Sequence, residues 1–177
     1  VGKDGNPAPL EDFVKVINVN LIGTYNAARV FAAACAKLDP MEDGERGAMV
    51  FTASVAAFDG QVGQQAYSAS KAAVISYCES LRVALRRHAI DVVTIAPGYI
   101  DTPMTQINTY PMPFLMPADA FARQAVKAIT AGRSYVVIPW PMRGVSWLLR
   151  CLPNWLYDRV MARAPYKASY QEFNDAP

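Results

Sequence analysis

The fold follows from residues 48–98, which read AMVFTASVAAFDGQVGQQAYSASKAAVISYCESLRVALRRHAIDVVTIAPG. The stretch begins with an apolar, partly β-branched run at 48–55, which predicts a buried strand. After a loop rich in Gly and Gln, residues 66–88 carry a long helical pattern. A second apolar run at 91–96 predicts another buried strand. Two buried strands separated by a helix indicate a parallel sheet.

The segments on either side continue this alternation. Apolar residues three and four apart predict one long helix over 10–38, which a polar loop separates from the first strand. Farther along the chain, 119–130 predicts a helix and 134–140 a third strand. We therefore expect an α/β fold with a parallel sheet and helices on both faces. A single domain should span residues 1–177, with 141–177 as an apolar and basic helical extension.

Composition and charge exclude several classes of protein. The 177 residues are 53% apolar, which suffices for a core and excludes a disordered chain. A net charge of +2 argues against nucleic acid as the main partner, and no apolar run is long enough to predict a transmembrane helix. Cys35, Cys78, Cys151 and the single His88 have no spacing that predicts disulfides or a metal site. We expect a reduced, cytoplasmic compartment.

In parallel sheets of this kind, functional residues collect at the carboxyl ends of the strands. Tyr67 and Lys71 lie four apart near the start of the second helix, so they share one face. A phenol has an unperturbed pKa of about 10, and a neighbouring lysine cation favours the phenolate and lowers that pKa. Ser54, at the end of the first strand, can donate a hydrogen bond to an oxygen that gains negative charge. The three residues predict general acid/base chemistry.

A Tyr-x-x-x-Lys pair alone is a weak motif, because exposed Tyr and Lys neighbours are common on helices. The order of the surrounding features makes the pattern more specific. A strand ends in Ser54, Tyr67 follows thirteen residues later, Lys71 four residues after that, and a second strand ends in Pro97-Gly98.

Four motifs in this order resemble the short-chain dehydrogenase/reductases. They are Val19-Asn20-Leu21-Ile22-Gly23, Ser54, Tyr67-Ser68-Ala69-Ser70-Lys71 and Pro97-Gly98-Tyr99-Ile100-Asp101-Thr102. Members of this family are Rossmann-fold oxidoreductases that depend on NAD or NADP. The resemblance implies the C-terminal part of a Rossmann-like, doubly wound parallel sheet. It also implies hydride transfer that interconverts a hydroxyl and a carbonyl, with a tyrosine as the acid/base.

The resemblance assigns a role to each candidate residue. Tyr67 would exchange the proton, Lys71 would lower its pKa and hold the nicotinamide ribose, Ser54 would steady the substrate carbonyl, and Asn20 would hold a water in a proton relay. The residues implied to bind cofactor are Tyr67, Lys71, Pro97, Gly98, Ile100 and Thr102. The residues implied to line the substrate pocket are Ser54, Ala56, Gln64, Tyr99, Met104 and Phe114.

Two parts of the chain resemble different branches of the family. Residues 10–71 look like type 2 3-hydroxyacyl-CoA dehydrogenases, whereas residues 74–167 look more like uncharacterised bacterial members. The substrate implied is an apolar alcohol or ketone, or an acyl compound. Because the family commonly assembles through the helices expected at 10–38 and 66–88, a homodimer or homotetramer is implied.

The Gly-rich turn that binds the cofactor's phosphates does not occur in this sequence, since Gly60 and Gly63 lie in a loop. The chain opens with Val1, and its first methionine is Met41. We therefore expect the cofactor-binding half of the family's domain to lie outside this sequence. The residue that selects NAD or NADP would lie there too, so the preference is not readable.

Three features keep alternative interpretations. The loop 103–117 either closes over substrate or caps the core. The segment 143–167, which Pro153 divides into two short helices, packs on the pocket or on another subunit, or lies on a membrane surface. Finally, the chain is either the catalytic part of an oxidoreductase or a catalytically silent partner in an assembly.

Overall fold

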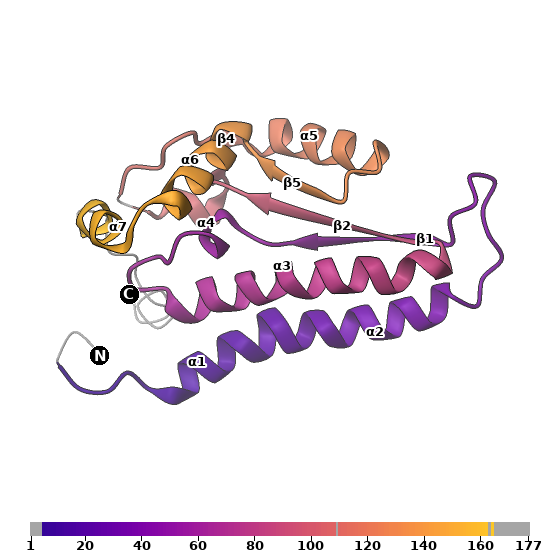
Figure 1. Cartoon of the computed structure of the whole chain (residues 1–177), viewed down its shortest axis with the longest axis horizontal. Coiled ribbons are helices and arrows are strands. Elements are labelled where there is room, and N and C mark those ends of the chain that lie inside the picture. The colour runs from indigo at the N-terminus through magenta and orange to yellow at the C-terminus, as the bar shows by residue number, and fades with distance from the viewer. Residues whose placement is uncertain (1–4, 109, 163, 165–177) are drawn as a thin grey trace.

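The sheet at the centre of the protein is parallel and has three strands. A computed structural model describes residues 5–108, 110–162 and 164, and Figure 1 shows it. Strands β1 (Gly47–Thr52), β2 (Ile90–Pro97) and β5 (Tyr135–Ile138) lie in the order β1-β2-β5. Both pairs are parallel, so the expected parallel sheet is confirmed, with β2 in the middle.

Two long helices cover one face of the sheet (Figure 1). The first runs without interruption through α1 (Leu10–Ile17), a π-helical segment (Asn18–Gly23) and α2 (Thr24–Cys35). The second is α3 (Gln65–Leu85), which a 3-10 turn extends to His88. The predicted helix over 10–38 is therefore confirmed, although it ends at Cys35 and contains an unpredicted π-helical segment.

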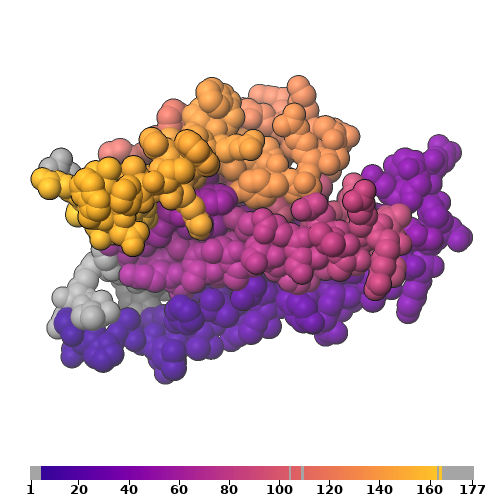
Figure 2. Space-filling model, viewed as in Figure 1, coloured from indigo at the N-terminus to yellow at the C-terminus, as the bar shows by residue number. Residues whose placement is uncertain are grey.

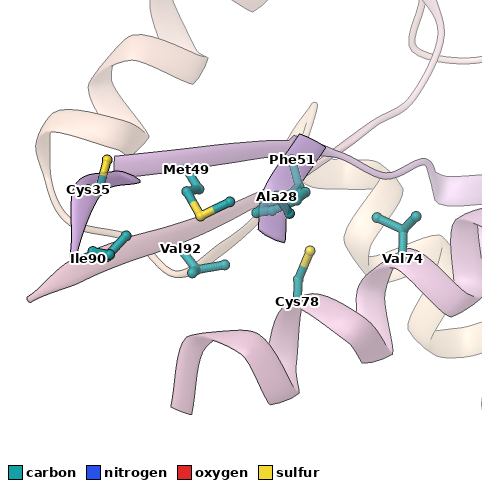
Figure 3. Packing of buried hydrophobic residues seen from close by; sticks show 8 residues of the cluster. All are labelled: Ala28, Cys35, Met49, Phe51, Val74, Cys78, Ile90 and Val92. Carbon is teal, nitrogen blue, oxygen red and sulfur yellow. The ribbon is translucent and has the colours of Figure 1, made fainter. Parts of the chain in front are cut away.

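The core on this face joins both helices to β1 and β2. Figure 3 shows the buried side chains, which are Ala28, Cys35, Met49, Phe51, Val74, Cys78, Ile90 and Val92. Complete burial of a Met, Phe, Val or Ile side chain in such a cluster contributes about 1.5–3 kcal/mol to folding. This cluster fixes α3 against the strands and thereby sets the position of its first turn, which carries Tyr67.

Helix α5 (Ala118–Thr130) covers the opposite face (Figure 1). Val93 and Ile95 of β2 and Ile138 of β5 pack there against Ala125. Since successive side chains of a strand point to opposite faces, β2 contributes Val92 to one layer and Val93 to the other. Burial on both faces explains why this strand is an almost continuous apolar run.

The first and third predicted strands end earlier than the apolar runs indicated. Strand β1 ends at Thr52 rather than at residue 55, because Val55–Ala57 form a 3-10 turn. Strand β5 ends at Ile138 rather than at residue 140, because Pro139 caps α6 (Trp140–Cys151). In both places a polar or proline cap, rather than the end of the apolar run, terminates the strand.

The segments after β2 contain more regular structure than the sequence predicted. The loop after Pro97 includes β3 (Ile100–Asp101), α4 (Pro103–Gln106) and β4 (Met116–Pro117), and β3 pairs with β4. After α6, Pro153 caps α7 (Asn154–Met161), so the predicted division into two short helices is confirmed. The remainder of the predicted extension, apart from residues 162 and 164, lies outside the described residues.

Apolar side chains of the first long helix and of β1 face solvent. The outer side of α1, the π-helical segment and α2 exposes Leu10, Phe13, Val14, Val19, Ile22 and Val30. Strand β1 lies at an edge of the sheet, and its Val50 is 47% exposed on the face opposite α3. Within residues 5–108, 110–162 and 164, no helix combines the length and the hydropathy that crossing a bilayer requires.

Candidate active site

Ser54 lies two residues beyond the carboxyl end of β1. Its backbone is extended, and its Oγ accepts a hydrogen bond of 3.1 Å from the backbone N–H of Ala56. Ser54 therefore caps the 3-10 turn Val55–Ala57, whose three side chains are buried. The cap explains why the chain leaves the sheet here and why the hydroxyl remains at the end of the strand.

Tyr67 and Lys71 lie one helical turn apart in the first half of α3, as their spacing predicted. The Tyr67 phenol shares a side-chain hydrogen bond with Ser54. Lys71 Nζ donates a hydrogen bond of 2.9 Å to the carbonyl oxygen of Thr52 and lies 5.7 Å from the centre of the Tyr67 ring. The structure thus brings together three of the four predicted catalytic residues at the carboxyl end of β1.

The electrostatics of this group differ from the expectation. Burial raises the pKa of Tyr67, and the hydrogen bond with Ser54 only partly opposes this shift. Burial also lowers the pKa of Lys71, since it disfavours the ammonium ion. The predicted lowering of the Tyr67 pKa by Lys71 is therefore wrong for this arrangement, in which desolvation of the phenol is the larger effect.

Asn20, the fourth predicted catalytic residue, lies in the π-helical segment. Its Nδ2 donates a hydrogen bond of 3.1 Å to Ser70 Oγ, and Ser70 Oγ in turn donates one of 2.7 Å to the backbone oxygen of Tyr67. Ser70 is completely buried. Sequence reasoning missed this role of Ser70, although its position inside the motif Tyr67-Ser68-Ala69-Ser70-Lys71 was a signal.

The residues expected to face the cofactor follow β2. Pro97 ends the strand, and the N–H of Gly98 donates a hydrogen bond of 2.8 Å to the carbonyl oxygen of Ile138. A Cβ at Gly98 would lie 3.0 Å from Met142 Cγ and 3.2 Å from Pro139 Cδ. A glycine thus permits close packing against the start of α6, a reason that the sequence did not indicate.

Ile100 and Thr102 are held by hydrogen bonds around α4. Thr105 Oγ1 donates a hydrogen bond of 2.6 Å to the carbonyl oxygen of Ile100 and accepts one of 2.9 Å from the N–H of Thr102. A capping box between Thr102 and Thr105 begins α4. Both predicted cofactor residues therefore lie on a turn with a defined conformation.

The predicted substrate residues lie in several places. Tyr99 and Tyr110 are half-buried, and their rings meet edge to face with centres 6.4 Å apart. Burial raises the pKa of Tyr99 to about 12, so this phenol is neutral at physiological pH. Phe114 is 50% exposed and has a left-handed backbone conformation with φ of +58°. The side chain of Met104 lies outside what the structure describes.

Two further predicted pocket residues belong to the connection between Ser54 and Tyr67. Ala56 is only 2% exposed, so its contribution to the site is the N–H that bonds to Ser54 Oγ. Gln64 caps α3, and its N–H donates a hydrogen bond of 3.0 Å to the carbonyl oxygen of Gln61. Gln64 thus ends the loop that connects Ser54 to Tyr67.

Comparison with known proteins finds relatives of this chain. A family model described as short chain dehydrogenase matches residues 3–111. A 3-hydroxyacyl-CoA dehydrogenase type-2 from Drosophila melanogaster is 53% identical over 95 residues, which cover 54% of this chain and 37% of that protein. An uncharacterised oxidoreductase from Myxococcus xanthus is 36% identical over 155 residues, which cover 88% of this chain and 59% of that protein.

A solved structure is also similar. The crystal structure of 3-hydroxyacyl-CoA dehydrogenase type-2 from Mycobacterium avium superimposes with a TM-score of 0.68 at 40% identity, covering 77% of this chain and 59% of that protein. Across these three relatives, the chain spans between 37% and 59% of the relative's length.

Proposed function

Because the chain belongs to the short-chain dehydrogenase family, we propose that it carries the catalytic residues of an NAD(P)-dependent oxidoreductase that interconverts a hydroxyl and a carbonyl. The observation that carries the proposal is the hydrogen bond between the Ser54 hydroxyl and the Tyr67 phenol, one helical turn from Lys71. An exposed Tyr and Lys pair on a solvated helix would have neither the serine partner nor the burial.

Tyr67 is the general acid/base in this proposal. Its raised pKa keeps the phenol protonated at neutral pH, so it can donate a proton to a carbonyl oxygen that is being reduced. Ser54 donates a second hydrogen bond to the same oxygen and stabilises the charge that develops there. In the oxidation direction, Tyr67 instead receives the hydroxyl proton.

Asn20 and Ser70 hold the helix turn that carries Tyr67. Ser70 Oγ receives the hydrogen bond from Asn20 and bonds to the Tyr67 backbone oxygen, so it connects the π-helical segment to α3. We infer that this connection keeps the phenol within reach of Ser54. The expected water bound by Asn20 stays a prediction.

The residues present fit the nicotinamide end of a dinucleotide. The Lys71 ammonium has three hydrogens, and the Thr52 carbonyl accepts one of them, so donors are available for ribose hydroxyls. Ile100 and Thr102 offer an apolar side chain and a polar one on the turn beyond Pro97-Gly98. Bound NAD(P) would supply the hydride acceptor or donor. The choice between NAD and NADP rests on residues other than these.

We infer that the substrate is apolar or carries an acyl chain. Tyr99 and Tyr110 form an aromatic pair beyond β2, and Phe114 exposes a further aromatic ring in the same connection. Two relatives are named 3-hydroxyacyl-CoA dehydrogenase type-2, which supports a 3-hydroxyacyl or 3-oxoacyl compound as the first substrate to test. Neither the aromatic pair nor the names of these relatives favour a substrate that is strongly charged next to the reacting carbon.

Replacement of Tyr67 by Phe tests the function. Removal of the phenolic oxygen should lower kcat by at least about 100-fold and leave the affinity for NADH or NADPH, measured by quenching of tryptophan fluorescence, nearly unchanged. Tyr77→Phe is the matched control, since Tyr77 lies on the same helix and contacts Tyr25 and Phe51 instead of Ser54. Turnover by Tyr67→Phe at the native rate would refute the assignment.

A further inference from the structure

Helix α6 contacts both turns that carry the proposed site. Its Met142 is buried with Ala53 and Ala96, which precede Ser54 and Pro97 respectively. A Cβ at Gly98 would lie only 3.0 Å from the Cγ of the same Met142. In Figure 2 the orange and yellow atoms of α6 and α7 form the upper left of the molecule. A single helix thus rests against both active-site turns.

Two polar side chains of α6 hold the turn after Ser54. Ser146 and Arg150 lie four residues apart and therefore on one face of the helix. Ser146 is buried, and its Oγ donates a hydrogen bond of 3.4 Å to Asp59 Oδ2. Arg150 donates from Nε to the carbonyl oxygen of Phe58 at 3.3 Å and from Nη2 to that of Ala57 at 3.5 Å. Helix α6 therefore donates hydrogen bonds to three consecutive residues, Ala57, Phe58 and Asp59.

These three residues comprise the last residue of the turn that Ser54 caps and the two residues that follow it. Ala57 ends the 3-10 turn, and its N–H donates a hydrogen bond of 3.1 Å to the Ser54 carbonyl oxygen. Ser54 Oγ accepts from Ala56 within the same turn. A displacement of Ala57 or Phe58 would therefore also displace the Ser54 hydroxyl, because two hydrogen bonds connect Ser54 to this turn.

We propose that Asp59, Ser146 and Arg150 are positioning residues that fix the Ser54 hydroxyl through the turn Val55–Ala57. The inference rests on the proposed function for the catalytic role of Ser54. It adds that helix α6, and not the sheet alone, determines where this hydroxyl points.

The state of Asp59 argues against a purely structural contact. Among the described residues, its Oδ1 is buried and has no hydrogen-bond partner, which costs stability. Burial raises the pKa of Asp59 to about 6, while the hydrogen bond from Ser146 and the charge of Arg150 oppose the shift. From α7, Tyr157 also faces this carboxylate; burial raises the pKa of the Tyr157 phenol, and the charge of Asp59 adds to this shift. At neutral pH the fold thus carries a carboxylate that lowers stability and attracts Arg150.

This arrangement makes stability and activity change in opposite directions with pH. Because the folded-state pKa of Asp59 lies above the unfolded value, its ionisation destabilises the folded protein as pH rises toward neutrality. The same ionisation creates the attraction to Arg150 that holds the turn. Asp59→Asn should therefore be more stable than the native protein at about pH 7.5 and yet less active.

The test combines amide exchange with kinetics. In the native chain and in Asp59→Asn and Arg150→Gln, hydrogen exchange of the Ala56 amide reports the cap on Ser54 without any need for turnover. We expect faster exchange in both variants. In the active enzyme we expect kcat to fall about tenfold at neutral pH with little change in KM for the cofactor. Asp59→Glu keeps a carboxylate, so it should be more active than Asp59→Asn. Like the native enzyme, it should lose activity below about pH 6.

Arg143→Gln is the matched control, because Arg143 is an exposed arginine on the same helix and, among the described residues, donates no hydrogen bond to Ala57 or Phe58. Unchanged Ala56 exchange in Asp59→Asn and Arg150→Gln would overturn the proposal whatever the enzyme does. A loss of activity that parallels a loss of stability in Asp59→Asn would overturn it as well. Failure of the proposed function is distinguishable, since it would appear as native turnover in Tyr67→Phe.

Discussion

Asn20 Nδ2 and Ser70 Oγ lie 3.1 Å apart and join two helices whose hydrogen-bonded residues are 50 positions apart in the chain. Ser70 is completely buried, and its Oγ donates a hydrogen bond to the backbone oxygen of Tyr67. The candidate site is therefore held from three sides, by α3, by the π-helical segment and by α6.

Ser70→Ala should lower the free energy of unfolding by about 1–3 kcal/mol, because it removes two hydrogen bonds and leaves the Asn20 amide without this acceptor. Urea denaturation measures the change. Ser76→Ala, an exposed serine on the same helix, should differ from the native protein by less than about 0.5 kcal/mol. Equal stabilities of the two variants would contradict the importance of the connection.

The pH dependence of the two reaction directions should differ. Since burial raises the pKa of Tyr67, the protonated phenol required for reduction persists throughout the neutral range. Oxidation requires the phenolate, so its rate should continue to rise as the pH becomes alkaline. Initial rates in both directions, measured with the active enzyme, check this. An oxidation rate that levels off at or below neutral pH would indicate that Tyr67 has a lowered pKa.

Gly98→Ala should destabilise the protein by about 1–3 kcal/mol, because the new Cβ would lie 3.0 Å from Met142 Cγ and 3.2 Å from Pro139 Cδ. Gly144→Ala is the matched control within α6, where a Cβ would meet nothing within 4 Å. That substitution should stabilise by about 0.5–1 kcal/mol, since Ala is the better helix former. Thermal unfolding measures the two stability changes, which should have opposite signs. A Gly98→Ala variant as stable as the native protein would show that the Met142 side chain moves away at little cost.

The exposed apolar side of α1 and α2 should mediate assembly of identical chains. Val30→Asp places a charge on this side and should shift the mass in light scattering toward that of one 19.4 kDa chain. Val126→Asp is the control, since Val126 on α5 is also 57% exposed. Dissociation by Val126→Asp alone would place the interface on the opposite face.

Residues whose roles depend on local spacing could be predicted from the sequence. The face shared by Tyr67 and Lys71, the buried strand at 91–96 and the division of the C-terminal helices at Pro153 all follow from periodicity or from the constraints on proline. These patterns specify an element by its own residues, so the fold of the central part was readable.

Features that depend on contacts between distant segments were not readable. The pKa of Tyr67 follows from how deeply the fold buries it. A Cβ at Gly98 would be crowded by Met142, which lies 44 residues away. Likewise, the contact of Arg150 with Phe58 joins residues 92 positions apart. No local pattern encodes such pairs, because each residue taken alone is equally compatible with solvent exposure.

The π-helical segment Asn18–Gly23 has a consequence for insertions and deletions. A π-helical turn accommodates one more residue than an α-helical turn, so it is equivalent to a single-residue insertion in a regular helix. Deletion of the exposed Val19 would remove this extra residue and restore a regular helix, so the two halves would keep their faces toward α3. A regular α-helix with the same number of residues would instead rotate the two halves by about 100° relative to each other, and only one half could then keep its face toward α3. Substitutions at Val19 should therefore be tolerated, whereas a change that converts the wide turn into α-helical turns of the same length should not be.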